Sequence, residues 1–133
     1  MRGFAVFAVA LAVLAAGSAA GSSPRTALTV TYWEQGRAAG DKIVWTLACS
    51  PARGTLTHPG VACRRLAAGG RKLFAPVPKN VACTEIYGGP QEALVVGSVQ
   101  GRRVWARFAR RNGCEIARWS RISPWLLPPG GVS

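Results

Sequence analysis

Apolar and polar residues alternate along much of the chain, and a period of two is typical of half-buried β-strands. The alternation predicts four strands, at residues 28–33, 41–48, 93–99 and 102–109. The last two are the clearest, and a Gln100-Gly101 turn would join them into a hairpin. In the final strand one face would carry Val104, Ala106 and Phe108, which could serve as core or as an interface.

Helical composition is confined to residues 62–68, and Gly69-Gly70 would end that helix after two turns at most. The segments between the predicted elements are rich in proline and glycine. We therefore expect irregular loops at residues 50–60 and 76–90.

The end of the chain has no clear period. Residues 119–127 are apolar and are expected to add an edge strand, whereas the Pro- and Gly-rich residues 128–133 are expected to fray. A chain of 133 residues leaves room for one domain with a sizeable core. The sequence therefore predicts a single α+β domain over residues 27–127, dominated by antiparallel strands.

The first twenty residues have the three-part pattern of a secretory signal. Arg2 supplies a positive charge, residues 4–16 form an unbroken apolar run, and small residues follow at 17–20. A retained membrane anchor is the alternative, but the run is shorter than the roughly 20 residues that a membrane span needs. We expect residues 1–20 to be removed and residues 21–26 to form a flexible leader. The mature protein would then be extracellular and free of the membrane.

Export to an oxidising compartment predicts that the four cysteines form two disulfides. The cysteines are Cys49, Cys63, Cys83 and Cys114. No CxxC pair is present, so a zinc site is a poor fit, and we expect neither metal nor cofactor. Four cysteines allow three pairings, and their spacing does not choose among them.

The chain is strongly basic, with 17 Lys and Arg against 5 Asp and Glu and a formal net charge of +12. Such a charge points to an anionic partner, for example nucleic acid or a cell-envelope polymer. Basic doublets interleaved with Trp105 and Trp119 could form its binding surface; they lie at 64–65, 71–72, 102–103 and 110–111. No recognised nucleic-acid motif accompanies them, and solubility is the simpler interpretation. A secreted basic binding module is thus the alternative function.

Acid–base catalysis has few candidate residues. His58 is the single histidine and lies in a turn-like Thr-His-Pro context, and Asp41 is the single aspartate. No GxSxG nucleophile elbow is present, and no spacing singles out the acid–base pair that a small ribonuclease would need. We expect that the protein is not an enzyme and that His58 is exposed or stabilises a turn.

The stretch at residues 83–90, CTEIYGGP, combines the features of a stiff, exposed strand. A half-cystine opens it, three residues of extended propensity follow, and a Gly-Gly-Pro break closes it. A segment ordered in advance could enter a protease cleft at low entropic cost and pair with its backbone. An ordinary disulfide-anchored loop is equally compatible with these residues alone.

Over residues 27–118 the chain resembles the Streptomyces subtilisin inhibitor family of secreted actinobacterial protease inhibitors. The resemblance includes four cysteines in register together with the signal-peptide pattern. The matching stretches are LTV at 28–30, LACSP at 47–51, THP at 57–59, ACRRLA at 62–67, CTEIYGGP at 83–90, GRRV at 101–104 and CE at 114–115.

The resemblance implies a five-stranded antiparallel sheet flanked by two short helices. It also implies disulfides Cys49–Cys63 and Cys83–Cys114, and a homodimer formed by packing of sheet faces. Its functional implication is substrate-like inhibition of extracellular serine proteases of the subtilisin type.

In the family the residue two positions after the third cysteine fills the primary pocket of the protease. Here that residue is Glu85, so the resemblance implies a reactive bond between Glu85 and Ile86. Cys83 and Thr84 would contact the protease on the acyl side, and Tyr87 on the leaving side.

Many relatives carry Lys or an apolar residue where this chain has Glu85. A carboxylate buried without a partner is strongly disfavoured, and the acid of a trypsin-type pocket would repel it. We therefore expect inhibition of subtilisin-like proteases, possible inhibition of glutamyl endopeptidases, and weak or no inhibition of trypsin.

The loop between the first two cysteines departs from the family pattern. Three residues separate Gly54 from His58, and only Gly60-Val61 separates the His-Pro pair from the following Ala-Cys. This rebuilt loop leaves a role for His58 open.

Overall fold

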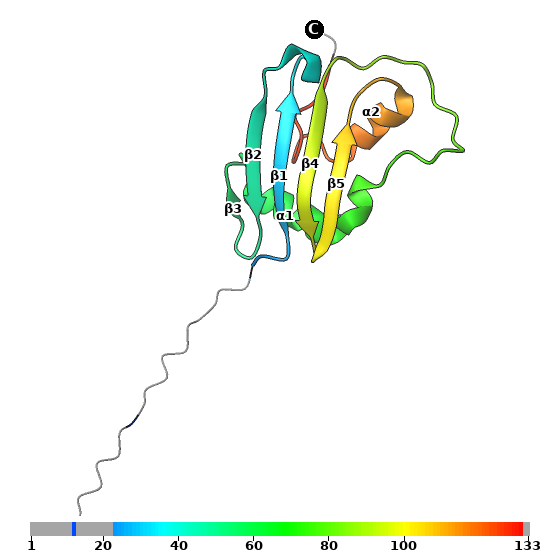
Figure 1. Cartoon of the computed structure of the whole chain (residues 1–133). Helices are drawn as coiled ribbons and strands as arrows, with labels where there is room; N and C mark the ends of the chain where they lie inside the picture. The colour runs from blue at the N-terminus through cyan, green and yellow to red at the C-terminus, as the bar shows by residue number, and fades with distance from the viewer. Residues whose placement is uncertain (1–11, 13–22, 132–133) are drawn as a thin grey trace, which may run out of the picture.

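Five strands form one antiparallel sheet in the order β3-β2-β1-β4-β5 in the computed structural model, which describes residue 12 and residues 23–131 (Figure 1). The strands are β1 Ala27–Trp33, β2 Ile43–Ala48, β3 Arg53–Gly54, β4 Glu92–Val99 and β5 Arg102–Phe108. The sheet implied by the family resemblance is confirmed. The predicted signal sequence lies outside the described residues, apart from Ala12.

Within residues 23–131, two α-helices and two short 3₁₀ helices accompany the sheet. They are η1 Arg37–Ala39, α1 Pro59–Gly69, η2 Gly70–Phe74 and α2 Gly113–Ser120. Figure 1 shows α1, α2 and the C-terminal segment on the far side of the sheet, with nothing over the near side. The domain therefore has two layers and one open sheet face.

Helix α1 is longer than the sequence predicts, because it begins at Pro59 rather than Ala62. Proline suits the first turn of a helix, where its missing N–H has no partner to lose. The helix ends at Gly69, and the next residue, Gly70, has a φ of 62° that glycine adopts readily.

The predicted edge strand at residues 119–127 is wrong. Trp119 belongs to α2, and the residues after it form turns in which Leu126 N and Leu127 N donate to Ile122 O at 2.9 and 3.0 Å. The four large side chains Trp119, Ile122, Leu126 and Leu127 are almost completely buried. An apolar run without a period marks burial but does not specify a strand.

The core lies between the sheet and the helical layer. The inner face of the sheet contributes alternate residues of β1, β4 and β5 together with one residue of β2: Leu28, Val30, Tyr32, Leu47, Ala93, Val95, Val99, Val104, Ala106 and Phe108. The helical layer contributes Leu66, Phe74, Trp119, Ile122, Leu126 and Leu127. Val104 and its two partners on β5 are therefore core and not an interface.

The two disulfides have the pairing that the resemblance implies. Cys49–Cys63 links the end of β2 to α1, and Cys83–Cys114 links the segment before β4 to the start of α2. No helix in the described part of the chain is long and apolar enough to cross a membrane.

The residues after Leu127, which the sequence predicts to fray, contact the core as far as Gly131. Trp119 Nε1 donates to Pro128 O at 2.9 Å, and Gln91 Nε2 donates to Gly131 O at 2.7 Å. The last two residues of the chain lie outside the described part.

Candidate functional site

Residues 75–91 connect η2 to β4 without regular strand or helix, and Figure 1 shows this connection projecting beyond α2. Residues 84–87, which are all exposed, are here named the presented segment. Ile86 and Tyr87 are 62% and 56% exposed, although such apolar side chains are usually covered. Thr84 and Glu85 are exposed as well.

The upstream end of the presented segment is fixed to α2. Cys83 forms its disulfide with Cys114, the second residue of that helix. The helix start is itself stabilised, because the Asn112 side chain accepts a hydrogen bond from Glu115 N at 3.0 Å. The residue before the presented segment is therefore covalently attached to a capped helix terminus.

Two backbone hydrogen bonds hold the segment at its ends. Gly113 N donates to Thr84 O at 2.9 Å, and Gly88 N donates to Arg110 O at 2.7 Å. Among the described residues, no hydrogen bond engages the backbone of residues 85–87. A short stretch with free N–H and C=O groups, held on both sides, is suited to pairing with another extended backbone.

The Arg110 side chain strengthens the downstream attachment. Its Nε donates to Gly88 O at 2.9 Å, and its guanidinium lies 5.6 Å from the ring centroid of the buried Trp119. Gly130 approaches so closely that a Cβ at this position would clash with the Arg110 side chain. Arg110 therefore connects the end of the presented segment to the core.

Two glycines allow the segment to lie against α2. A Cβ at Gly88 would be 2.7 Å from the Ile116 side chain, and a Cβ at Gly113 would clash with Thr84 Oγ1. A larger residue at either position would force the neighbouring side chain or the backbone to shift, because Cβ atoms do not approach other atoms this closely.

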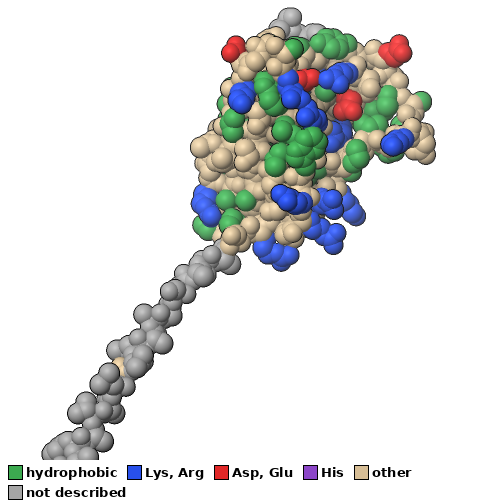
Figure 2. Space-filling view, in the orientation of Figure 1, with side chains coloured by type: hydrophobic (Ala, Val, Ile, Leu, Met, Phe, Trp, Pro, Cys, Tyr) green, Lys and Arg blue, Asp and Glu red, His purple; other side chains and the backbone are tan. Residues whose placement is uncertain are grey.

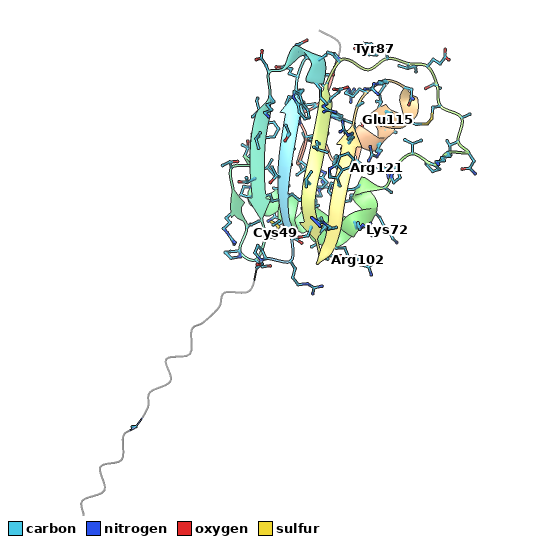
Figure 3. All side chains as sticks on the ribbon, viewed as in Figure 1. Cys49, Lys72, Tyr87, Arg102, Glu115 and Arg121 are labelled. Carbon is cyan, nitrogen blue, oxygen red and sulfur yellow. A yellow bond between two sulfur atoms is a disulfide. The ribbon has the colours of Figure 1, made fainter. Side chains whose placement is uncertain are left out.

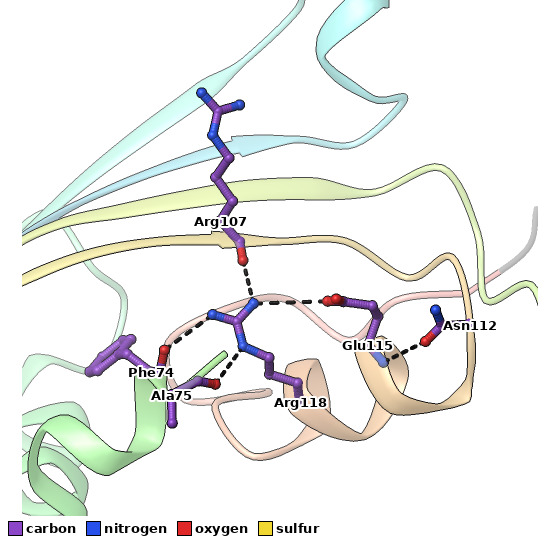
Figure 4. Close-up of polar contacts among 6 residues, drawn as sticks. All are labelled: Phe74, Ala75, Arg107, Asn112, Glu115 and Arg118. Atoms are coloured by element: carbon purple, nitrogen blue, oxygen red, sulfur yellow. Dashed lines mark hydrogen bonds and ion pairs between the residues drawn. The ribbon is translucent and has the colours of Figure 1, made fainter. Parts of the chain in front are cut away.

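Buried Arg118 fixes α2 to the rest of the domain (Figure 4). Its guanidinium donates to the carbonyl oxygens of Phe74, Ala75 and Arg107. The Phe108 ring lies 4.0 Å from the guanidinium carbon, and Glu115 forms a longer ion pair at 3.8 Å. Burial lowers the pKa of Arg118, and Glu115 opposes this shift. Helix α2, which holds the presented segment through Gly113 and Cys114, is thus bound to both η2 and β5.

Glu85 carries a free carboxylate. Within residues 23–131 the ion pairs are Arg111–Glu92 at 2.7 Å and Arg118–Glu115, and Glu85 is in neither. Its side chain is exposed and is available to an external partner.

The residues considered for catalysis are not brought together. His58 is exposed just before α1, as expected, and no hydrogen bond in the described part of the chain joins it to Asp41. In the same residues no group of three or more His, Cys, Asp or Glu side chains could hold a metal ion.

Sequence reasoning located the presented segment but missed what holds it. The sequence predicts that Arg110 lies with Arg111 on a basic surface and that Trp119 stacks there, whereas Trp119 is buried. It predicts only a break at Gly88-Gly89, whereas Gly88 also packs against Ile116. Only the Asn112 cap had a local signal, an Asn with Glu115 three positions later.

A family model and a solved structure match the chain. The model of the family described as subtilisin inhibitor-like matches residues 22–112. No curated protein matches the chain. One similar solved structure is the crystal structure of Streptomyces caespitosus sermetstatin in complex with Bacillus licheniformis subtilisin. That match has 27% identity and a TM-score of 0.49, and it covers 76% of this chain and 96% of that chain. Because the family match spans more than half of the sequence, the chain belongs to the subtilisin inhibitor-like family.

Proposed function

We propose that this protein is a secreted, substrate-like inhibitor of subtilisin-type serine proteases. The observation that carries the proposal is the presented segment, an exposed stretch held on both sides within a subtilisin inhibitor-like domain. Secretion is supported by the signal-like pattern of residues 1–20 and by two disulfides, which persist in oxidising compartments.

Binding would proceed by pairing of the segment with the protease cleft. The free backbone groups of residues 85–87 would bond to the cleft backbone, with Glu85 in the primary pocket. Cys83 and Thr84 would contact the upstream subsites, and Ile86 and Tyr87 the downstream ones. Fixing one residue of a flexible chain costs about 1–2 kcal/mol. Much of that cost is removed here, because folding already orders the flanks.

The same contacts would make hydrolysis of the inhibitor by the protease slow. Attack by the protease serine on the Glu85 carbonyl would form an acyl ester and release the amine of Ile86. That amine would stay close, because Gly88 is bound through both its N–H and its C=O to Arg110. The acyl side would be retained by the Cys83–Cys114 disulfide. Attack of the amine on the ester then competes with water and restores the peptide bond.

The unpaired carboxylate of Glu85 would select the protease. A pocket with cationic or hydroxyl groups, as in a glutamyl endopeptidase, would compensate for its desolvation. A shallow, partly hydrated pocket of the subtilisin type would tolerate it, with Ile86 and Tyr87 supplying apolar contact. A trypsin-type pocket would repel it.

The open sheet face supports a homodimer. Along it, β1, β4 and β5 align Thr29, Val96 and Trp105 in one row and Thr31, Leu94 and Arg107 in the next. Trp105 is 62% exposed, and Figure 2 shows a patch of hydrophobic side chains on this face. A second copy would cover the patch by face-to-face sheet packing, at a distance from the presented segment.

Titration tests the proposed function. The oxidised protein without residues 1–20 is added to subtilisin, a glutamyl endopeptidase and trypsin at known active-site concentrations. We expect stoichiometric loss of subtilisin activity and little effect on trypsin. Digestion of the protein at many bonds, with subtilisin activity unchanged, would overturn the proposal.

A further inference from the structure

Positive and negative charges are separated along the sheet. The five carboxylates belong to Glu34, Asp41, Glu85, Glu92 and Glu115, which lie outside the end that carries the β4–β5 turn. Figure 2 shows acidic side chains only in the upper part of the molecule, whereas basic side chains gather at the lower end. The end that contains the Gln100-Gly101 turn therefore carries cations alone on this face.

A hollow of about 430 Å³ lies at this basic end, between η2 and the start of β5. Four basic residues line it: Arg71 and Lys72 from η2, and Arg102 and Arg103 from β5. The buried side chains of Phe74 and Val104 also line it. In the described part of the chain none of the four cations forms an ion pair. We name this hollow the basic groove.

A second hollow of about 380 Å³ lies beside the same turn and adds Arg25 and Arg64. The turn between the hollows is fixed, because Arg25 donates to Gln100 O at 3.0 Å and Gln100 Nε2 donates to Ala67 O at 3.2 Å. Cations therefore flank the turn on two sides, without a carboxylate to neutralise them.

We propose that the basic groove binds a linear polymer of phosphodiester chemistry. Arg and Lys side chains on both walls of a hollow suit successive phosphates of one chain, since guanidinium and ammonium groups bind phosphate oxygens strongly. Trp105 also lines the basic groove, and its exposed ring has the Arg107 guanidinium 5.0 Å from its centroid. Stacking on such a ring accepts any base, because every base has a π-face. Recognition would therefore be independent of base sequence.

The basic groove lies far from the presented segment, so its role would be separate from inhibition. Figure 3 shows Lys72 and Arg102 at the end of the sheet opposite Tyr87. A polymer in the basic groove would leave the presented segment free, so the protein could inhibit proteases while it is retained on an anionic surface. The two activities are measured independently.

Salt-dependent binding tests the proposal with two probes, a fluorescent (dT)₃₀ oligonucleotide and fluorescent poly(glycerol phosphate). The test variant is Arg71→Glu/Lys72→Glu/Arg102→Glu, and the control Arg37→Glu/Lys42→Glu/Arg121→Glu carries the same charge change at exposed positions outside the groove. Each phosphate contact adds roughly 0.7 to the slope of log affinity against log salt for a single strand. We expect the groove variant to lose about two units of slope and at least about tenfold in affinity, and the control to lose less than about threefold.

Comparable binding of both probes would support recognition of the shared phosphate chain. Equal weakening by the two triple variants would overturn the proposal, because net charge and not the groove would then be responsible. Absence of binding at 50 mM salt, or binding that depends on the bases of the oligonucleotide, would also overturn it. Unchanged inhibition of subtilisin confirms that each variant is folded; if the glutamate triple fails that check, Arg71→Gln/Lys72→Gln/Arg102→Gln replaces it.

Discussion

Arg110 binds Gly88 at the downstream end of the presented segment, and under the proposed mechanism it should keep the amine of Ile86 in place after cleavage. Hydrogen bonds to charged groups contribute about 1.5–3 kcal/mol, and Arg110→Ala removes the one to Gly88 O. We expect the variant to be hydrolysed at least about tenfold faster at Glu85–Ile86 by subtilisin, since about 1.4 kcal/mol corresponds to a factor of ten. The rate of appearance of cleaved protein measures this.

The neighbouring Arg111 provides the control. It is largely exposed and forms a surface ion pair with Glu92, and such pairs contribute about 0–1 kcal/mol. Arg111→Ala should therefore change the hydrolysis rate little. If subtilisin hydrolyses Arg110→Ala as slowly as the native inhibitor, Arg110 does not position the segment. Hydrolysis of Arg110→Lys at a rate between those of the native protein and Arg110→Ala would support its role.

If Glu85 enters the primary pocket as proposed, its side chain should select the protease that is inhibited. Glu85→Lys should gain trypsin inhibition by at least about tenfold, because the substitution replaces repulsion in the trypsin pocket by an ion pair. Glu85→Gln should retain subtilisin inhibition and lose any preference for glutamyl endopeptidases. Inhibition constants against the three enzymes give the profile, and an unchanged profile in both variants would mean that the reactive bond lies elsewhere.

At the scale of elements, the contact between α2 and the presented segment depends on Gly113. Gly113→Ala places a Cβ against Thr84 Oγ1, and such overpacking costs about 1–3 kcal/mol. We expect a lower melting temperature together with weaker subtilisin inhibition. Gly131→Ala is the matched control, because a Cβ there meets nothing within 4 Å. Native inhibition by Gly113→Ala would show that this contact does not order the segment.

Helix α2 depends on Arg118 for its position. Arg118→Met leaves three carbonyl oxygens without their donor, and one buried polar group left unsatisfied costs about 1–3 kcal/mol. Unfolding in guanidinium chloride should reveal a loss of this size. Exposed Arg121, one turn later, gives the comparison: Arg121→Met should stay within about 0.5 kcal/mol of native. Equal stability of the two variants would contradict the conclusion that Arg118 holds α2 in position.

Alternation located the long strands because their inner faces are uniformly apolar. The two-residue β3 is too short for any period. Helix α2 is not predicted, because its last two residues belong to the apolar run that favours an edge strand, and eight residues form a stable helix only with tertiary contacts. The presented segment was found from Cys83 and the glycines that follow it. The contacts that hold this segment cannot be predicted in the same way. The backbone hydrogen bonds of Gly113 and Arg110 reach residues that are distant in the sequence and that only the fold brings together.

At the scale of the whole molecule, the open sheet face predicts a dimer that depends on Trp105. Trp105→Glu should convert a dimer into a monomer in sedimentation equilibrium, because a carboxylate would be buried at the interface without a partner. Val61 is also exposed but lies on α1, behind the sheet, so Val61→Glu should remain dimeric. A monomeric native protein, or a dimeric Trp105→Glu, would contradict face-to-face packing.

The central claim is that both sides of Glu85–Ile86 stay in place after cleavage, so that hydrolysis is reversible on the folded protein. The most direct test starts from two samples, intact protein and protein already cut at this bond, each incubated with a catalytic amount of subtilisin. Mass spectrometry then follows the ratio of intact to cleaved chains. We predict that both samples converge on one ratio. If the cut sample never regains the bond while the intact sample is digested to completion, the account is contradicted.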